Sequence, residues 1–361
     1  MTVPGLPDRR RAAEILEAFP GLRLAVIGDF FLDAYFDCDP ALEEISLETG
    51  RPCHQVIRTR RQAGAAGTVA TNLAALGVGS IEAVGFCGDD GEGYELRRAM
   101  TGLGLDLSGF FVCPERFTPT YGKPCHVDPA RPGAPVTEEL ERLDLKNRQP
   151  TPARLQRQLL DHLMSRASAW DGAAVLDQAN EAECGVLTTR VRRGVVAAAR
   201  RRPRTVFLAD SRERIGLFRK VCTKPNQFEA ARALEEPTST PPSRPRSRPT
   251  LTASRRHALA LADRTGRPVF LTLGTRGMLV ADRGSVIQVP AFAVEGPVDP
   301  VGAGDATSAA LLACLAGGAS LVEAAWIAAA AASITVQQLG TTGTATPAQI
   351  RRRLRELPHA S

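Results

Sequence analysis

The chain has 361 residues, of which 43% are hydrophobic and 23% charged, a composition typical of a globular protein with room for one large α/β domain or two modest ones. Its formal charge of +6 comes from arginines that are scattered and lack interleaved aromatic residues, so we expect no nucleic-acid partner. The eight cysteines form no CxxC pair and no secretory signal precedes them, which indicates reduced thiols and a cytoplasmic protein.

The N-terminal half alternates between strand-like and helical stretches. A polar helix is predicted at 9–19, followed by a buried strand at 22–28 that ends in glycine. Residues 34–61 are more polar and predict an inserted flap of short strands. The predicted elements that follow are a glycine-rich turn and helix at 64–77, a strand at 81–88, a helix at 93–104 and a strand at 107–113.

The C-terminal half continues this alternation, which predicts a largely parallel sheet covered on both faces by helices. Its strand-like stretches are 173–177, 205–210, 269–274 and 278–282. Residues 236–254 are rich in Pro, Ser and Arg and predict a disordered surface loop. The apolar region 309–336 is broken by two glycines and a glutamate, so we expect two packed helices and no membrane span.

One glycine-containing turn has the character of an anion site. Gly302, Ala303 and Gly304 precede an Ala/Leu-rich helix, and small residues there leave the first backbone N–H groups uncovered at the positive end of the helix dipole. Asp305 has two interpretations at this point: an ordinary N-cap, or a catalytic base that faces a phosphate in transfer. The chain has no P-loop, no dinucleotide fingerprint, no Cys/His metal cluster and no GxSxG elbow.

Several motifs occur in a fixed order along the chain. They are 28-GDFFLDAYF-36, 64-GAAGTVATNLAALG-77, 224-KPNQFEA-230, 271-LTLGTRGMLV-280, 299-DPVGAGD-305 and the closing segment 333-SITVQQLGTTG-343. Together they resemble the ribokinase/PfkB family of carbohydrate kinases over roughly residues 20–355, and within it the kinase domain of the bifunctional ADP-heptose synthases. The resemblance implies a ribokinase-like α/β fold over 1–361: a mostly parallel central sheet flanked by helices, with a small β-strand flap as a lid.

The resemblance also implies an activity and assigns residues to it. The γ-phosphate of ATP, with Mg²⁺, would pass to a hydroxyl of a sugar or sugar phosphate such as a heptose phosphate, with Asp305 as the base and Gly302, Ala303 and Gly304 as the anion hole. The expected nucleotide-side residues are Asn226, Gln227, Glu229, Thr272, Gly274 and Gly277, with Glu229 acting on the metal indirectly. The expected sugar-side residues are Asp33, Gly64, Gly67, Asn72 and Lys123. A monovalent cation and a homodimer formed through the open strand edges of the flap are further expectations.

Departures from the family pattern keep alternatives open. Thr68 and Ala65 replace an Asn and a Gly of the sugar-side motif, Ala329 replaces an Asn expected near the adenine, and 177–185 replaces the SDYxKG stretch. The acceptor could therefore be a fructose-like sugar or a nucleoside, or the chain could be a catalytically weak sensor of a sugar phosphate or a nucleotide. We expect no second, nucleotidyltransferase domain.

Structural roles explain some of the candidate residues equally well. Helix packing accounts for Asn72, a strand end for Thr272, and a strand-end turn for Asp177. A surface ion-pair face accounts for Arg142 and Asp144, which together with Lys123 are candidates for binding a phosphorylated sugar.

Overall fold

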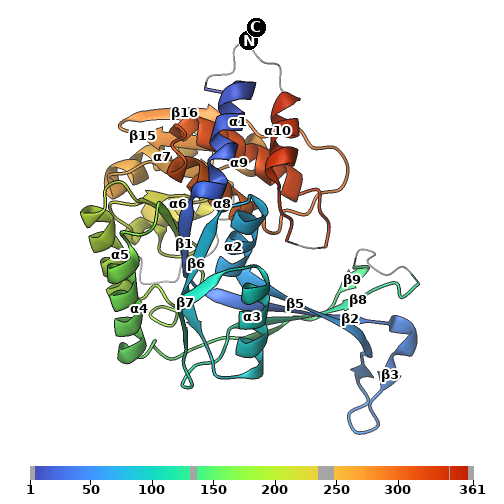
Figure 1. The fold of residues 1–361 in the computed structure, drawn as a ribbon. Coiled ribbons are helices and arrows are strands. Elements are labelled where there is room, and N and C mark those ends of the chain that lie inside the picture. The colour runs from blue at the N-terminus through green and yellow to red at the C-terminus, as the bar shows by residue number, and fades with distance from the viewer. Residues whose placement is uncertain (1–4, 131–135, 235–247, 341, 357–361) are drawn as a thin grey trace.

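A nine-stranded sheet forms the centre of the fold, and its order is β16-β15-β14-β13-β12-β11-β1-β6-β7 (Figure 1). The computed structural model describes all residues except 1–4, 131–135, 235–247, 341 and 357–361. In this sheet order, the seven neighbouring strands that start at β7 and end at β14 are parallel. At the edge beyond β14, β15 and β16 continue the sheet in antiparallel pairing. The strand bounds are β1 (Arg23–Gly28), β6 (Ser80–Cys87), β7 (Asp106–Val112), β11 (Gly172–Asp177), β12 (Val206–Ser211), β13 (Cys222–Thr223), β14 (Val269–Thr272), β15 (Met278–Asp282) and β16 (Ser285–Val289).

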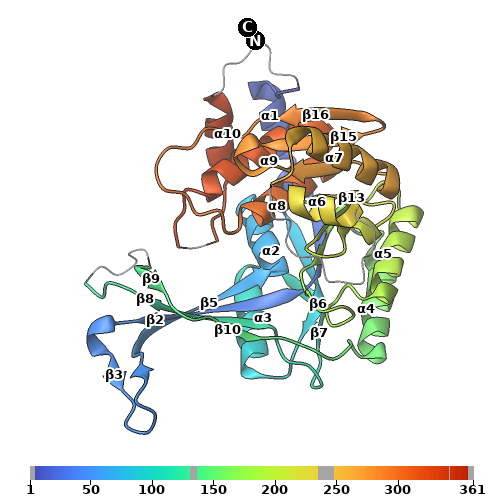
Figure 2. The same ribbon diagram turned by 180° about the vertical axis from the view of Figure 1, so that it is seen from behind.

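Helices cover both faces of this sheet (Figures 1 and 2). The helix bounds are α1 (Arg9–Glu17), α2 (Ala66–Ala75), α3 (Gly91–Gly102), α4 (Ala153–Arg166), α5 (Thr189–Arg201), α6 (Gln227–Leu234), α7 (Leu251–Thr265), α8 (Ala303–Ala316), α9 (Leu321–Thr335) and α10 (Pro347–Arg355). One apolar core lies between the sheet and α2, α8 and α9, and a second lies between the opposite face and α4 and α5. Because both faces are covered, strands such as β11 are buried at every residue, as is typical of parallel sheets.

A second, smaller sheet projects from the main body and forms the flap (Figure 1). Its order is β10-β8-β2-β5, with β9 paired to β8, and a separate β3–β4 pair lies beyond it. The bounds are β2 (Phe30–Cys38), β3 (Glu44–Ile45), β4 (Pro52–Cys53), β5 (Val56–Ala65), β8 (Thr120–His126), β9 (Glu138–Glu139) and β10 (Leu143–Leu145). The sequence placed only 34–61 in the flap. It missed 120–145 because the seven residues of β8 contain no apolar run, and β9 and β10 are only two and three residues long.

Two expectations about loops and helices have clear outcomes. The loop expected at 236–254 lies partly outside the described residues. Its last four residues were predicted wrongly, because 251–254 form the first turn of α7. The Thr250 hydroxyl accepts from the Ala253 N–H there and caps the helix. The two helices expected in 309–336 are confirmed as α8 and α9. None of the described helices is both long enough and apolar enough to cross a membrane.

Candidate functional site

The turn before α8 leaves the start of that helix open. Gly302 is the N-cap residue with φ +82° and ψ −10°, a left-handed conformation that favours glycine, and among the described residues no side chain caps the helix. Asp305 is the third helical residue and lies inside the first turn, so the N-cap interpretation is wrong. A Cβ added at Gly304 would have only the Lys224 ammonium near it, at 3.7 Å, so the helix start faces a cation.

Asp305 lies in a neighbourhood that shifts its titration to neutrality. Burial and the nearby Asp210 carboxylate raise the pKa of Asp305 to about 7, while Lys224 and Arg212 oppose the shift and Asp33 adds to it. The interaction with Asp33 is informative because that residue belongs to the flap strand β2. The structure therefore brings the flap carboxylate and the α8 carboxylate into one electrostatic neighbourhood. A carboxyl group with a pKa near neutrality is suited to accept a proton at physiological pH.

Lys224 and Asp210 form a buried ion pair beneath this turn. The Lys224 Nζ atom lies 2.9 Å from Asp210 Oδ2, and that oxygen also accepts from the Ser308 hydroxyl of α8 at 3.0 Å. Lys224 is only 4% exposed. Although burial opposes protonation, Asp210 and then Glu229 raise the pKa of Lys224, so it stays a cation.

The sequence analysis missed both members of this pair. The available signal was their position at the carboxyl ends of the neighbouring parallel strands β12 and β13, where ligands gather in open α/β sheets.

Asn226 and Glu229 form a reciprocal cap at the start of α6. The Asn226 side-chain oxygen accepts from the N–H groups of Phe228 and Glu229, each at 2.9 Å, and the Glu229 carboxylate accepts from the Asn226 N–H at 2.8 Å. This is a capping-box arrangement, so both residues have a structural role. Burial, then Asp210, raises the pKa of Glu229, and Lys224 opposes the rise.

The two nucleotide-side motifs lie next to each other. Asn226 forms an isolated parallel bridge with Thr272, whose N–H donates to the Pro225 carbonyl at 2.9 Å. Gly277 has φ +86°, and a Cβ there would lie 2.1 Å from the Val289 carbonyl oxygen, so only glycine fits.

Other predicted nucleotide-side residues have contacts within the protein. Gln227 accepts from the Arg276 guanidinium at 2.8 Å. Gly274, with φ +63°, begins the short 3₁₀ turn Gly274–Arg276. Both therefore shape the turn that follows β14, and Gln227 offers its carbonyl oxygen to the protein itself.

Asp33 and Lys123 form an ion pair on the two adjacent parallel flap strands β2 and β8. The Lys123 Nζ atom lies 3.0 Å from Asp33 Oδ1, donates to the Tyr35 hydroxyl at 3.2 Å, and sits 4.6 Å from the centroid of the Tyr35 ring. Both charged side chains are largely buried. Although burial opposes it, the Asp33 carboxylate raises the pKa of Lys123, so a permanent cation stands beside a carboxylate.

Gly64 allows the backbone of β5 to approach this pair. A Cβ at Gly64 would lie 2.6 Å from Asp33 Oδ2, so any side chain would displace the carboxylate. The next residue, Ala65, has φ +53° and ψ −115°, a backbone conformation that is ordinarily reserved for glycine.

Gly67 and Asn72 serve packing inside α2. A Cβ at Gly67 would lie 2.5 Å from the Ala63 methyl group. The buried Asn72 amide donates to the Thr68 carbonyl of its own helix at 3.0 Å. These contacts support the structural explanation of Asn72.

Arg142, just before β10, and Asp144, on β10, form an ion pair with two hydrogen bonds of 2.7 and 2.9 Å, and the guanidinium lies over the Tyr121 ring. Nearly half of the Arg142 side chain is exposed, which favours the surface ion-pair explanation.

Comparisons with known proteins connect this geometry to a family. Residues 221–349, which contain the nucleotide-side motifs and the α8 turn, match the family described as pfkB family carbohydrate kinase. The chain is 31% identical over 346 residues to the bifunctional protein HldE of Trichlorobacter lovleyi, and 32% identical over 349 residues to that of Rhodopseudomonas palustris. The chain therefore contains a pfkB family carbohydrate kinase domain. The resemblance found in the sequence is thus confirmed, and members of this family are phosphotransferases with an alcohol group as acceptor.

The alignments cover 95% and 96% of this chain, but only 65% and 66% of the two HldE proteins. Solved structures share the fold at lower identity. Arabidopsis thaliana ribokinase complexed with ribose and ATP has a TM-score of 0.66 at 18% identity, covering 92% of this chain and 99% of that one. Escherichia coli phosphofructokinase-2 in complex with substrates and products has a TM-score of 0.68 at 19% identity, covering 93% and 99%. The ribokinase-like fold expected from the sequence is confirmed.

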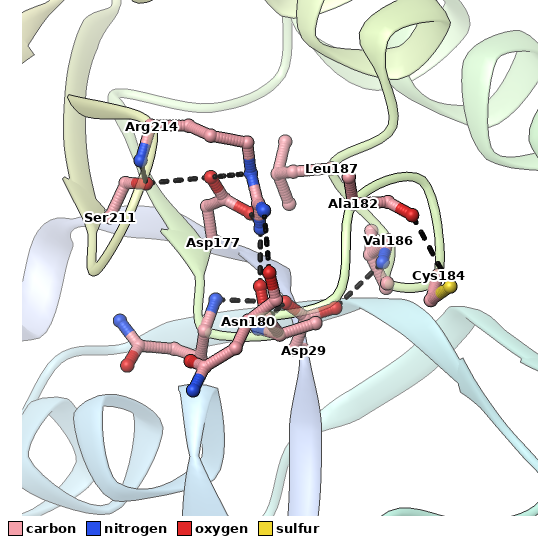
Figure 3. Close-up of polar contacts among 12 residues, drawn as sticks. Asp29, Asp177, Asn180, Ala182, Cys184, Val186, Leu187, Ser211 and Arg214 are labelled. Carbon is pink, nitrogen blue, oxygen red and sulfur yellow. Dashed lines mark hydrogen bonds and ion pairs between the residues drawn. The ribbon is translucent and has the colours of Figure 1, made fainter. Parts of the chain in front are cut away.

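Asp177 binds the Arg214 guanidinium through both of its carboxylate oxygens (Figure 3). Its carboxylate accepts from the Ser211 hydroxyl at 2.6 Å and from Arg214 Nε and Nη2 at 3.0 and 2.6 Å. The same guanidinium donates to the carbonyls of Ala179 and Asn180. These contacts give Asp177 a structural role, because both of its carboxylate oxygens accept hydrogen bonds from the protein.

The stretch 177–185, which differs from the family pattern, forms a loop that is hydrogen-bonded to the Asp29 carboxylate. Asp29 accepts from the N–H groups of Gln178, Ala179 and Val186 at 2.8, 2.9 and 2.6 Å (Figure 3). Burial, then the charge of Asp177, raises the pKa of Asp29 to about 6, and the three N–H donors oppose the rise. This stretch has therefore diverged from the family pattern without losing a defined structure.

Proposed function

We propose that this chain transfers the γ-phosphoryl group of ATP to a hydroxyl of a sugar or sugar phosphate. The observation that carries the proposal is Asp305, half-buried in the open first turn of α8 with a pKa near 7 and with Lys224 beside the same turn. A pure anion-binding turn would gain nothing from a carboxylate at this place, because the carboxylate would repel the anion. A carboxylate directed to the attacking hydroxyl can accept the proton of that hydroxyl.

The proposed reaction assigns each charge a task. The acceptor oxygen attacks the γ-phosphorus, the bond from that phosphorus to the bridging oxygen breaks, ADP leaves, and the hydroxyl proton goes to Asp305. The N–H groups of the Gly302–Gly304 turn and the Lys224 ammonium face the transferring group and stabilise its negative charge. Positioning and charge stabilisation of this kind supply most of the catalysis in phosphoryl transfer.

Mg²⁺ fits the donor set near the proposed nucleotide site. Asp210 and Glu229 supply oxygen donors, which Mg²⁺ prefers, and the Asn226–Glu229 cap fixes the orientation of one of them. Glu229 and Asp210 would hold the ion through its water shell. Bound with ATP, Mg²⁺ neutralises phosphate charge. A monovalent cation is also part of the proposal, because a solved structure of the E. coli phosphofructokinase-2 is in complex with potassium.

The acceptor that we favour is a phosphorylated sugar of the heptose-phosphate type. Asp33 can accept from sugar hydroxyls, and the neighbouring Lys123 supplies a buried cation for an anionic acceptor. The similarity to the HldE proteins over 95–96% of this chain supports the choice. A fructose-like sugar or a nucleoside would use the same Asp33 carboxylate without needing the cation.

We further propose a cytoplasmic homodimer that pairs through the flap. All eight cysteines are free, which suits a reducing compartment. The outer flap exposes Leu42, Ile45 and Leu47 at 51, 59 and 100%, and a second copy of the chain would cover them together with the open strand edges.

The test is ATP consumption by the purified full chain with Mg²⁺ over a panel of sugars, sugar phosphates and nucleosides, including heptose 7-phosphate. We expect turnover on a phosphorylated sugar, with the phosphate product identified by mass. Turnover on a neutral sugar or a nucleoside alone would refute the acceptor class but keep the kinase. ATP binding without turnover on any acceptor would favour the sensor alternative.

A further inference from the structure

A cluster of metal-ligating side chains lies on the outer flap, and none of its residues is among those assigned to the proposed kinase site. Glu43 follows the short 3₁₀ helix Pro40–Leu42, His54 lies between β4 and β5, and His126 ends β8. One ligand atom from each of the three lies within 4.8 Å of the others. Glu43 Oε2 is 2.9 Å from His54 Nδ1, and the two imidazole rings are 5.5 Å apart. Three separate chain segments therefore converge at one point.

His126 is oriented as a metal ligand would be. Its Nδ1 atom lies 3.1 Å from Glu138 Oε2, while its Nε2 atom is buried and has no hydrogen-bond partner among the described residues. A buried nitrogen without a partner is costly, because it has lost water and gained nothing. In metal sites a ligating histidine usually donates its other ring nitrogen to a carboxylate, which fixes the tautomer and frees the remaining lone pair for the metal. Glu138 occupies that supporting position.

Within one chain, the outer flap lacks another source of stability. Every residue of the described segment from Pro40 to His54 is exposed or only partly buried, so it has no apolar core of its own. Its β3–β4 pair has two residues in each strand. Small substructures without a core commonly depend on a metal or on assembly for their order. An ion shared by Glu43, His54 and His126 would join this segment to β8.

We propose that Glu43, His54 and His126 bind one divalent transition-metal ion per chain, with Zn²⁺ as the best match, and that Glu138 holds His126 in the ligating orientation. Two imidazoles and one carboxylate are a ligand set that Zn²⁺ uses, with water completing a tetrahedron. Zinc–ligand distances of about 2.0–2.2 Å require the three ligand atoms to move slightly closer together. Part of each side chain is exposed, so rotation can achieve this. All ligands come from one chain, so the stoichiometry does not depend on flap pairing.

The experiment is a Zn²⁺ titration of the tag-free full chain after chelator treatment, in competition with a chromophoric chelator. The wild type should take up one ion per chain, and Co²⁺ at the same site should give the intense visible absorption of tetrahedral coordination. His126→Ala and His54→Ala should each weaken binding at least about 100-fold and lose that absorption. Glu138→Gln should weaken binding by about 10–100-fold, as expected for a supporting carboxylate. Zn²⁺ should raise the melting temperature of the wild type and not that of His126→Ala.

Two control variants separate this site from nonspecific uptake. Glu44→Gln removes the exposed acid next to Glu43, and His257→Gln removes a histidine of α7 that is outside the cluster. Both should bind Zn²⁺ as the wild type does. The proposal is overturned if the wild type binds no more tightly than His54→Ala, or if the two control variants lose binding to the same extent. Should His126→Ala not fold, His54→Ala decides alone, because its side chain is about one-third exposed and replacement removes little packing.

Discussion

Replacing Ala65 by glycine should stabilise the protein. Ala65 connects β5 to α2 with φ +53° and ψ −115°, and a Cβ in that region contacts its own backbone. The family motif has glycine here, and this chain retains the turn without the residue that the turn favours. Ala65→Gly removes the cause of the strain and leaves the rest of the turn unchanged.

The expected change in the free energy of unfolding follows from three contributions. A non-glycine residue held in such a region costs about 1–3 kcal/mol. Glycine loses about 0.5–1 kcal/mol more backbone entropy on folding than alanine does. The Ala65 methyl is only half-buried, so its removal costs a few tenths of a kcal/mol, well below the ~0.8 kcal/mol of a fully buried carbon. The net expectation is a stabilisation of about 1 kcal/mol.

Urea unfolding followed by circular dichroism measures this change. Ala65→Gly should raise the urea concentration at the unfolding midpoint, while the slope of the unfolding free energy against urea concentration stays the same. Ala66→Gly is a matched control at the next residue, which is fully buried and helical; it should lower stability by about 1 kcal/mol or more. If Ala65→Gly destabilises the protein as Ala66→Gly does, then the turn is not strained and the reasoning fails.

Three further predictions concern activity. Because the deprotonated carboxylate of Asp305 is the active form and its pKa is raised to about 7, kcat/KM should fall about tenfold per pH unit below that value and level off above it; a pH–rate profile that stays flat from pH 5 to about 8 contradicts this. Lys224→Met should lower kcat by about 10²-fold or more in steady-state kinetics, with folding checked by circular dichroism, and an unchanged kcat would remove Lys224 from the site. Lys123→Met should raise the KM for a phosphorylated acceptor by about tenfold or more and leave the KM for ATP unchanged. Lys146→Met removes a long 3.6 Å contact to Asp144 and a 5.9 Å contact to the Tyr121 ring, and it should change neither KM.

The sequence predicted those parts of the site that are local in the chain. The open turn before α8 follows from the order of small residues ahead of a helix-forming run, a pattern that the local sequence shows by itself. The same reasoning left the position of Asp305 open between a cap and a base, because helix starts are uncertain by one or two residues. The structure begins α8 at Ala303 and puts Asp305 in the third helical position.

The parts that escaped prediction depend on contacts between distant segments. The pairing of Lys224 with Asp210 requires β12 and β13 to be neighbours, which no local pattern states. In the flap, β8 has seven residues without an apolar run, and β9 and β10 have only two and three residues, so neither periodicity nor an apolar run indicates these strands. The convergence of Glu43, His54 and His126 is likewise invisible until β8 lies beside β2.

Transfer of labelled γ-phosphoryl from ATP to the best acceptor, compared between the wild type and Asp305→Asn, tests the central claim most directly. Asparagine keeps the size and the hydrogen-bonding oxygen of the side chain but cannot accept the proton. We predict that the variant binds ATP within about threefold of the wild type and loses about 10²–10⁴-fold in kcat, the range for a removed general base. A variant that transfers phosphate within about threefold of the wild-type rate would contradict the assignment of Asp305 as the base and the mechanism built on it.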